Sequence, residues 1–331
     1  MKIRRMTVAA IAALALSLSA CGSGGDSGGG SGDGGETTND LTFGTGGTSG
    51  TYYPLGGELA TIFEENVDGT SVNYVESGAS AENLGKIYQG EWQLGFTQSD
   101  TANNAVKGEL EDLDGTKIDN VGWIASLYPE AAHIIVREDS GIESVQDLKG
   151  KKIAVGDAGS GTRAISDAVL DAANIGEADY TPEITDFGAS TDMLADKQID
   201  ATIFVVGTPV AGLTQLAATT DVELLGLDEK TTSAIEENSG AESYDIPADA
   251  YDFLEEDVPT VSVFASLVAS TDQVSEDTAY GMTKALFEHS DEVTLDVGKL
   301  ITKDSAMLGI GDVPLHPGAQ KYYEEEGIDL P

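Results

Sequence analysis

Two segments of the chain share one order of elements: a short apolar strand, a glycine-rich turn and a helix. The first is LTFGTGGTSGTYYPLGGELATIFEEN at 41–66, and the second spans 153–173 around the turn DAGSGT. Other strands are expected at 71–76, 92–97, 180–187 and 201–206, and another helix at 79–89. Strands that alternate with helices predict an α/β fold with a mainly parallel sheet. Because the pattern occurs twice, we expect two lobes.

The two lobes require connections, and two further strand-like segments can supply them. HIIVR (133–137) and TVSVFASLVA (260–269) are apolar, rich in β-branched residues and far apart in the sequence. We therefore predict that the chain crosses between the lobes at these segments. Lobe one is expected to comprise residues 41–131 and 266–331, and lobe two residues 132–265.

Neither glycine-rich turn matches a nucleotide-binding motif. A dinucleotide fingerprint needs G-x-G-x-x-G; Gly44 and Gly46 fit it, but Ser49 stands at the third glycine position. The second turn has the glycine spacing of a P-loop, yet Thr162 and Arg163 stand where lysine and a hydroxyl residue are expected. Both turns nevertheless lead into a helix N-terminus, whose unpaired N–H groups attract anions. The alternative is that they are only well-capped helices.

The first forty residues have the pattern of an export signal followed by a tether. Three basic residues precede an apolar run, and LSAC (18–21) resembles a bacterial lipobox. Residues 1–20 are therefore a predicted lipoprotein signal peptide, with a lipid on Cys21, the only cysteine, as the sole anchor to the outer face of the cell membrane. The alternative is an ordinary signal peptide that ends near a cysteine. Residues 21–40 are rich in glycine and serine, which predicts a flexible tether.

The net charge of the chain is extreme, at −41 with 58 acidic residues against 17 lysines and arginines. Nucleic acid is excluded as a partner, because phosphate binding needs clustered basic residues. Adaptation to high salt accounts for the charge, since salt screens the self-repulsion of an acidic chain. The alternative, one acidic face for a partner, would be more local, whereas these acids are spread along the whole chain.

Five sequence blocks carry a resemblance to one receptor family. They are GTGGTSGTYYPLGGELA, SGASAENLGKIYQGEWQLGFTQSDTA, SLYPEAAHIIVREDSGIESVQDLKGKKIAVGDAGSGT, DATIFVVGTP and PLHPGAQKYYEEEG. In this order they resemble the TRAP-associated extracytoplasmic solute receptors called TAXI proteins, over nearly all of 41–331. The resemblance implies a two-lobed type II periplasmic-binding-protein fold with a ligand cleft between the lobes. It also implies capture of a small carboxylate or amino acid, foremost glutamate or glutamine, and delivery to a TRAP permease in the membrane.

The same resemblance implies a cleft lined from both lobes. The expected ligand-binding residues are Gly47, Thr48, Tyr52, Tyr53, Gln98, Ser99, Ser160, Gly161, Thr162, Arg163 and Thr208. Only one of Tyr52 and Tyr53 is expected to face the ligand, the other being a core residue. Asp100 is expected to cap the helix that begins at Thr101 rather than to touch the ligand. Arg163 either clamps a carboxylate through two hydrogen bonds or pairs with a surface acid.

The sequence gives little support for an enzyme or for a metal site. It has no H-E-x-x-H motif and no set of cysteine ligands, and its three histidines lie in separate contexts. Pairs of carboxylates arise by chance among 58 acids and do not indicate a glycosidase. We therefore expect a monomeric solute receptor that is not an enzyme and that holds no cofactor or metal. A lipid-tethered enzyme and a binding module for a protein partner are the alternatives.

Overall fold

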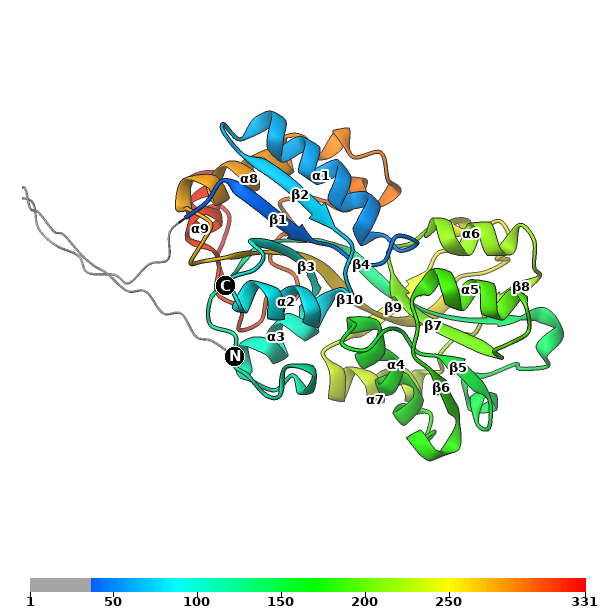
Figure 1. Cartoon of the computed structure of the whole chain (residues 1–331). Helices are drawn as coiled ribbons and strands as arrows, with labels where there is room; N and C mark the ends of the chain where they lie inside the picture. The colour runs from blue at the N-terminus through cyan, green and yellow to red at the C-terminus, as the bar shows by residue number, and fades with distance from the viewer. Residues whose placement is uncertain (1–36) are drawn as a thin grey trace, which may run out of the picture. The chain divides into compact units, whose positions relative to one another are not determined.

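A ten-stranded mixed sheet organises residues 37–331, which are the residues described by the computed structural model (Figure 1). The predicted signal peptide, Cys21 and the tether up to residue 36 lie outside the described residues. The strands are β1 (Asp40–Gly44), β2 (Ser71–Val75), β3 (Leu94–Gln98), β4 (Val121–Arg137), β5 (Lys152–Ala154), β6 (Thr181–Glu183), β7 (Ala201–Val206), β8 (Val222–Leu224), β9 (Glu242–Ile246) and β10 (Val258–Ser270). Their order is β2-β1-β3-β10-β4-β7-β5-β6, with β8 paired to β4 and β9 paired to β10.

Helices pack on the sheet in groups. They are α1 (Tyr52–Asn66), α2 (Ser80–Tyr88), α3 (Ser99–Lys107), α4 (Gly161–Ala172), α5 (Phe187–Ala195), α6 (Ala211–Ala217), α7 (Glu229–Ser239), α8 (Glu276–Glu288) and α9 (Pro317–Glu326). At the β1–β3 end, Figure 1 shows α1 and α8 on one side of the strands and α2 and α3 on the other. None of the helices in residues 37–331 combines the length and apolar character that a membrane span requires.

Helix α1 illustrates how the sequence produces these elements. Leu55, Leu59, Ile62 and Phe63 recur at helical spacing, and all four are buried. Pro54 stands in the first turn, where a missing N–H costs no intrahelical hydrogen bond. The apolar stripe packs into the core that β1 and β3 share with α8, so the helix predicted after the first glycine-rich turn is confirmed.

The centre of the sheet is antiparallel, which corrects the expected mainly parallel arrangement. β4 and β10 pair antiparallel from Ser262 opposite Ala131 to Ser270 opposite Val121. β1, β2 and β3 are parallel at one end, and β5, β6 and β7 are parallel at the other. The difference arises because the two long strands traverse both ends of the sheet in opposite directions. The segments 133–137 and 260–269 lie within these two strands.

The buried apolar residues fall into four clusters that sort by sequence. Two clusters draw only on residues up to Tyr128 and from Ala265 onward. The other two draw only on residues from Ala131 to Val263. The clusters therefore change membership along β4 and β10, within a few residues of the predicted lobe boundaries. Those boundaries themselves stay a prediction.

One expected strand is largely a different structure. Of the residues 180–187, only Thr181–Glu183 form a strand, and Phe187 begins α5. The Asp186 side chain accepts a hydrogen bond from the Ala189 N–H at 3.0 Å and so caps that helix. The apolar residues at 184 and 187 gave a strand-like pattern, but the capping side chain between them turns the chain into a helix.

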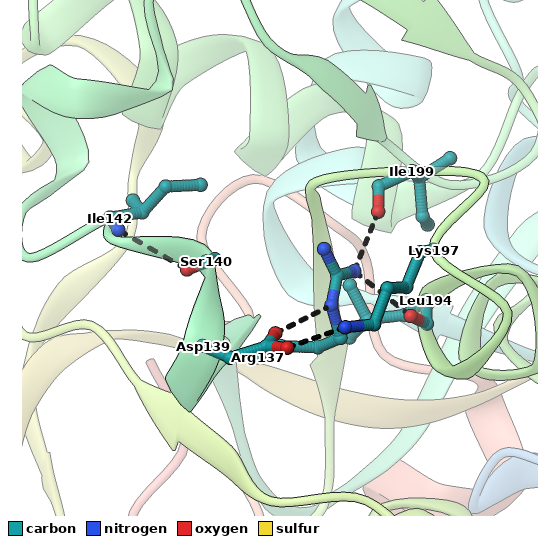
Figure 2. A network of polar contacts seen from close by, with 7 residues as sticks. All are labelled: Arg137, Asp139, Ser140, Ile142, Leu194, Lys197 and Ile199. Carbon is teal, nitrogen blue, oxygen red and sulfur yellow. Dashed lines mark hydrogen bonds and ion pairs between the residues drawn. The ribbon is translucent and has the colours of Figure 1, made fainter.

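A buried arginine joins the end of β4 to the end of α5 (Figure 2). Arg137 Nη1 donates to the carbonyl oxygens of Leu194 and Ile199, both at 2.9 Å. Leu194 lies in the last turn of α5, where its carbonyl also accepts a hydrogen bond from the Lys197 N–H at 3.1 Å. A cation at this end of the helix also suits the helix dipole. Arg137 Nε contacts Asp139 at 3.2 Å, and Lys197 contacts the other oxygen of Asp139 at 2.5 Å. This network is structural, since none of its side chains lines the cavity described next.

Candidate ligand-binding site

A cavity of about 70 Å³ lies where strands from both parallel ends of the sheet terminate. Its walls are the turns after β1 and β2, the end of β3, one residue of β4, the turn after β5, the loop after β6 and the end of β7. One water needs about 10–15 Å³ of such space, so the cavity suits a small solute. Ligands of open α/β sheets gather at the carboxyl ends of strands, and this cavity has that position.

Four helices begin at the cavity wall. The first residues of α1, α2, α4 and α5 are Tyr52, Ser80, Gly161 and Phe187, and each of them lines the cavity. Unpaired N–H groups and a partial positive charge occur at such helix starts. At α4, no acceptor within residues 37–331 takes the N–H of Gly161 or of the next residue. The cavity can therefore hold a negatively charged group without a basic side chain.

A buried carboxyl group closes the cavity on the β4 side. Glu130 is 2% exposed, and its Oε2 accepts hydrogen bonds from the Tyr52 hydroxyl at 2.9 Å and from Gln98 Nε2 at 3.1 Å. Burial raises the pKa of Glu130 to about 8, although these two hydrogen bonds act in the opposite direction. The carboxyl group is therefore mostly protonated at neutral pH in the ligand-free protein.

Two other polar atoms of the wall are buried without a partner among the described residues. They are Gln98 Oε1 and Thr51 Oγ1. A buried polar atom that makes no hydrogen bond costs about 1–3 kcal/mol. A solute with N–H or O–H donors would remove that cost, so these atoms favour a ligand that donates hydrogen bonds.

Acidic residues dominate the charge of the wall. Asp157 and Asp186 line the cavity together with Glu130. Burial, followed by the nearby charges of Asp186 and Glu82, raises the pKa of Asp157. No lysine, arginine or histidine of residues 37–331 lines this cavity. Its only attraction for anions is therefore that of the helix N-termini.

The two sides of the cavity touch at Gly161. A side chain at this position would place its Cβ 2.0 Å from Gln98 Oε1 and 2.9 Å from Ser80 Oγ. Only glycine allows α4 to approach β3 and α2 this closely, because its hydrogen replaces the Cβ atom. The α2–β3 side and the α4 side of the cavity are therefore in direct contact at this position.

Six of the eleven predicted ligand-binding residues line the cavity. They are Gly47, Tyr52, Gln98, Ser160, Gly161 and Thr162. Two of these side chains already have partners: Ser160 Oγ accepts from the Arg163 N–H at 3.1 Å, and Thr162 Oγ1 accepts from the Val205 N–H at 3.3 Å. Their ligand-binding role stays a prediction, which the position of these residues supports.

The other five predicted residues do not line the cavity. Tyr53 packs its ring against Tyr74 with 5.2 Å between centroids, and Ser99 Oγ accepts from the Phe264 N–H at 3.1 Å. Arg163 pairs with Asp167 at 2.7 Å, as in the surface alternative. The remaining two are Thr48, in a groove outside the cavity, and Thr208, before Pro209. A hydroxyl or cation next to a glycine turn in sequence can point away from it, and sequence spacing does not report that direction.

Three acids line the cavity but were not among the predicted residues: Glu130, Asp157 and Asp186. Glu130 is the only acid in the run VGWIASLYPEAAHIIVR, which is otherwise almost entirely apolar and buried. A single carboxyl group in such a run is a recognisable signal, because an unpaired buried charge is costly and is retained where it has a role. Asp100 lies in the first turn of α3, which begins at Ser99 rather than Thr101. It does not line the cavity.

Comparison with known proteins identifies the family. The NMT1-like family model matches residues 43–327. The chain belongs to the NMT1-like family. The alkanesulfonate-binding protein SsuA from Xanthomonas axonopodis pv. citri, bound to MOPS, aligns with this NMT1-like protein with a TM-score of 0.51 and 17% identity, over 77% of this chain and 76% of that chain. A protein from Bordetella bronchiseptica RB50 aligns with a TM-score of 0.50 and 17% identity, over 87% and 82%.

The likeness to SsuA confirms the predicted α/β periplasmic-binding-protein fold. The family model corrects the predicted family. The TAXI identity is wrong, because the family model that matches residues 43–327 is that of the NMT1-like family. The TRAP permease that the TAXI resemblance implied is therefore left without support. Glycine turns that lead into helix N-termini follow from the shared architecture, and so they do not distinguish one receptor family from another.

Proposed function

We propose that this NMT1-like protein is an extracytoplasmic solute-binding protein that captures a small amino acid and passes it to a membrane-embedded importer. The observation that carries the proposal is the cavity at the strand ends, with helix N-termini and carboxyl groups in one wall. An amino acid has both charges that such a wall can accept. Its carboxylate fits the helix starts near Gly161, and its ammonium fits the acids.

The charge of the wall narrows the class of amino acid. A side-chain carboxylate, as in glutamate, would need a second positive partner, and no basic side chain of the described residues lines the cavity. It would also lie near Asp157 and Asp186. The proposal therefore favours a neutral side chain, such as that of glutamine, over glutamate. A small carboxylate without an amine would leave the acidic part of the wall without a partner.

Capture by closure is part of the same proposal. We propose lobe one as residues 41–131 and 266–331 and lobe two as 132–265, hinged at β4 and β10. The contact of Gly161 with Gln98 supports a closed form in which the two sides of the cavity meet. Export and a lipid on Cys21 would hold the protein at the outer face of the membrane, where it would meet the importer.

A thermal-shift screen over amino acids and carboxylic acids, followed by titration calorimetry, tests the proposal. A ligand present at 100 times its Kd should stabilise the protein by about 2.7 kcal/mol. Amino acids with small neutral side chains should raise the Tm, whereas carboxylic acids without an amine should raise it much less. If no amino acid shifts the Tm or gives binding heat, the proposed function is wrong.

Two neighbouring tyrosines provide a matched control. Tyr52 lines the cavity and bonds to Glu130, whereas Tyr53 packs on Tyr74 outside it. Tyr52→Phe should weaken amino-acid binding roughly three- to tenfold, the effect of one hydrogen bond. Tyr53→Phe should leave the affinity unchanged. Equal effects of the two substitutions would place the ligand elsewhere.

A further inference from the structure

The Glu130 carboxyl group has one oxygen in use and one available. Both of its hydrogen bonds, from Tyr52 and Gln98, reach Oε2. Within residues 37–331 these are the two close hydrogen bonds of Glu130; the Tyr128 hydroxyl acts on the carboxyl group as a weaker donor, and no ion pair involves Glu130. The residue lines the cavity. A carboxyl group in this position can take a donor from a solute without losing its protein partners.

Among residues 37–331, no positively charged side chain balances this carboxyl group. The titratable and polar groups that act on Glu130 are Tyr52 from α1, Gln98 from β3, Asp100 from α3 and Tyr128 from β4 itself. Asp100 is an acid, and its charge adds to burial in favouring the protonated form of Glu130. The buried hydroxyl of Tyr128 acts on Glu130 as a hydrogen-bond donor, which favours the ionised form but brings no charge. The counter-charge must therefore come from a bound molecule if Glu130 is to ionise.

A second, independent feature, a set of acceptor atoms in the wall that are unpartnered within residues 37–331, indicates that the bound molecule carries hydrogen-bond donors. Gln98 is 3% exposed and lines the cavity, and its Oε1 is unpartnered among the described residues. Thr51 Oγ1, also on the wall, is unpartnered as well. These atoms and Glu130 Oε1 can all accept hydrogen bonds. An ammonium group has three N–H donors and no acceptor, which matches a wall rich in acceptors.

We propose that the ammonium group of the solute binds at Glu130 and that the carboxyl proton of Glu130 leaves to solvent in the same event. The O–H bond of the carboxyl group breaks, the proton goes to the buffer, and a charge-assisted contact forms between carboxylate and ammonium. No covalent bond to the solute forms. Glu130 is thus the residue that selects amines, and each binding event releases a proton. This inference rests on the proposed function, since it assumes that an amino acid occupies the cavity.

Titration calorimetry with L-glutamine at pH 7, in phosphate and in Tris, measures the released protons from the difference in binding heat between the buffers. A carboxyl group of pKa about 8 carries its proton in about nine tenths of molecules at pH 7. We therefore expect release of about 0.9 proton per glutamine bound. Glutaramate, the analogue of glutamine that lacks the amine, should bind at least about tenfold more weakly and release no proton.

Two carboxyl-to-amide variants identify the source of the proton. Glu130→Gln keeps the size and an acceptor oxygen, and it should abolish proton release and weaken glutamine binding at least about tenfold. Asp100→Asn is the control, because Asp100 is a buried neighbouring acid that does not line the cavity. Proton release should persist in this variant.

The results separate this inference from the proposed function. Glutamine binding without proton release, or equal binding by glutaramate, overturns the role of Glu130 and leaves a solute-binding protein. Loss of proton release in Asp100→Asn but not in Glu130→Gln would show that the proton comes from Asp100, and it would also overturn the role of Glu130. If neither glutamine nor any other amino acid binds, the proposed function itself fails, and this inference fails with it.

Discussion

The Ala81 N–H donates a hydrogen bond to the carbonyl oxygen of Gly159 at 3.1 Å. Ala81 lies in the first turn of α2, and Gly159 lies in the turn that leads into α4. The bond therefore joins the two sides of the cavity close to the place where Gly161 contacts Gln98. Ala81 belongs to one apolar cluster, and the buried face of α4 belongs to another. This backbone bond would break if the two sides separated.

Closure should depend on the absence of a side chain at Gly161. Gly161→Ala would place a methyl group against Gln98 and Ser80, so the closed form should become unfavourable and amino-acid affinity should fall at least about tenfold. Small-angle X-ray scattering with ligand should show a larger radius of gyration than for the wild-type complex. Gly176→Ala is the control, since nothing lies within 4 Å of a Cβ there. Wild-type affinity in Gly161→Ala would refute this role.

Stability should decrease as the pH rises from neutrality into the alkaline range. The pKa of Glu130 is raised from 4.5 to about 8, so the folded state binds this proton more tightly than the unfolded state. Its stabilising effect is complete below pH 4.5 and is lost between 4.5 and 8. The Tm of the ligand-free protein should thus fall from pH 6.5 to pH 8.5, and Glu130→Gln should flatten this part of the curve.

Below pH 6.5 other buried groups contribute. Burial lowers the pKa of His133 from 6.5 to about 4, so its contribution is present above 6.5 and is lost as the pH falls toward 4. Burial raises the pKa of Asp100 from 3.8 to about 6, so the contribution of Asp100 to stability increases as the pH falls from 6 to 3.8, opposite to that of His133. For this reason the test of Glu130 belongs above pH 6.5. An unchanged alkaline slope in Glu130→Gln would contradict the assignment.

The arginine network of Figure 2 should contribute measurably to stability. Arg137→Met would remove the side-chain donor from the carbonyl of Ile199 and one of the donors from the carbonyl of Leu194, which keeps the Lys197 N–H. We expect a loss of about 1–3 kcal/mol in the free energy of unfolding. Lys197→Met is the matched control: its side chain is 62% exposed against 10% for Arg137, and it should cost less than about 1 kcal/mol. Urea unfolding of both variants measures the difference, and equal losses would show that burial of Arg137 is unimportant.

High salt should stabilise the fold. The chain carries −41, and removal of the basic leader makes the remainder more negative. The Debye length shortens from about 10 Å at 0.1 M salt to about 3 Å at 1 M, which screens most of the repulsion between surface acids. Urea midpoints should therefore rise with KCl. Sucrose at equal osmolality controls for general exclusion effects, and a flat or falling KCl series would argue against salt adaptation.

The sequence predicted elements with strong local signals and missed properties set by distant partners. Helix α1 was predictable because its apolar stripe continues for about three turns, from Tyr52 to Phe63. The antiparallel centre was not, because the pairing of Ser262 with Ala131 depends on two segments that local patterns treat separately. Among site residues, Gly161 could be predicted from the turn motif. The role of Glu130 could not, because it depends on hydrogen bonds from Tyr52 and Gln98, which are distant in the sequence. Side-chain direction, as at Tyr53, is likewise a tertiary property.

The long pairing of β4 with β10 has a consequence for how the chain acquires its structure. Val121 is paired with Ser270, so the strand order β3-β10-β4 cannot form until the chain has been made as far as the end of β10 at Ser270. Contacts between segments so distant in sequence make folding slow and leave earlier parts exposed meanwhile. A chain that stopped before β10 would lack the middle of its sheet and the α8 and α9 layer together. The segment before β10 is therefore not expected to fold alone, and a chain truncated there should behave as an unfolded protein rather than as a smaller receptor.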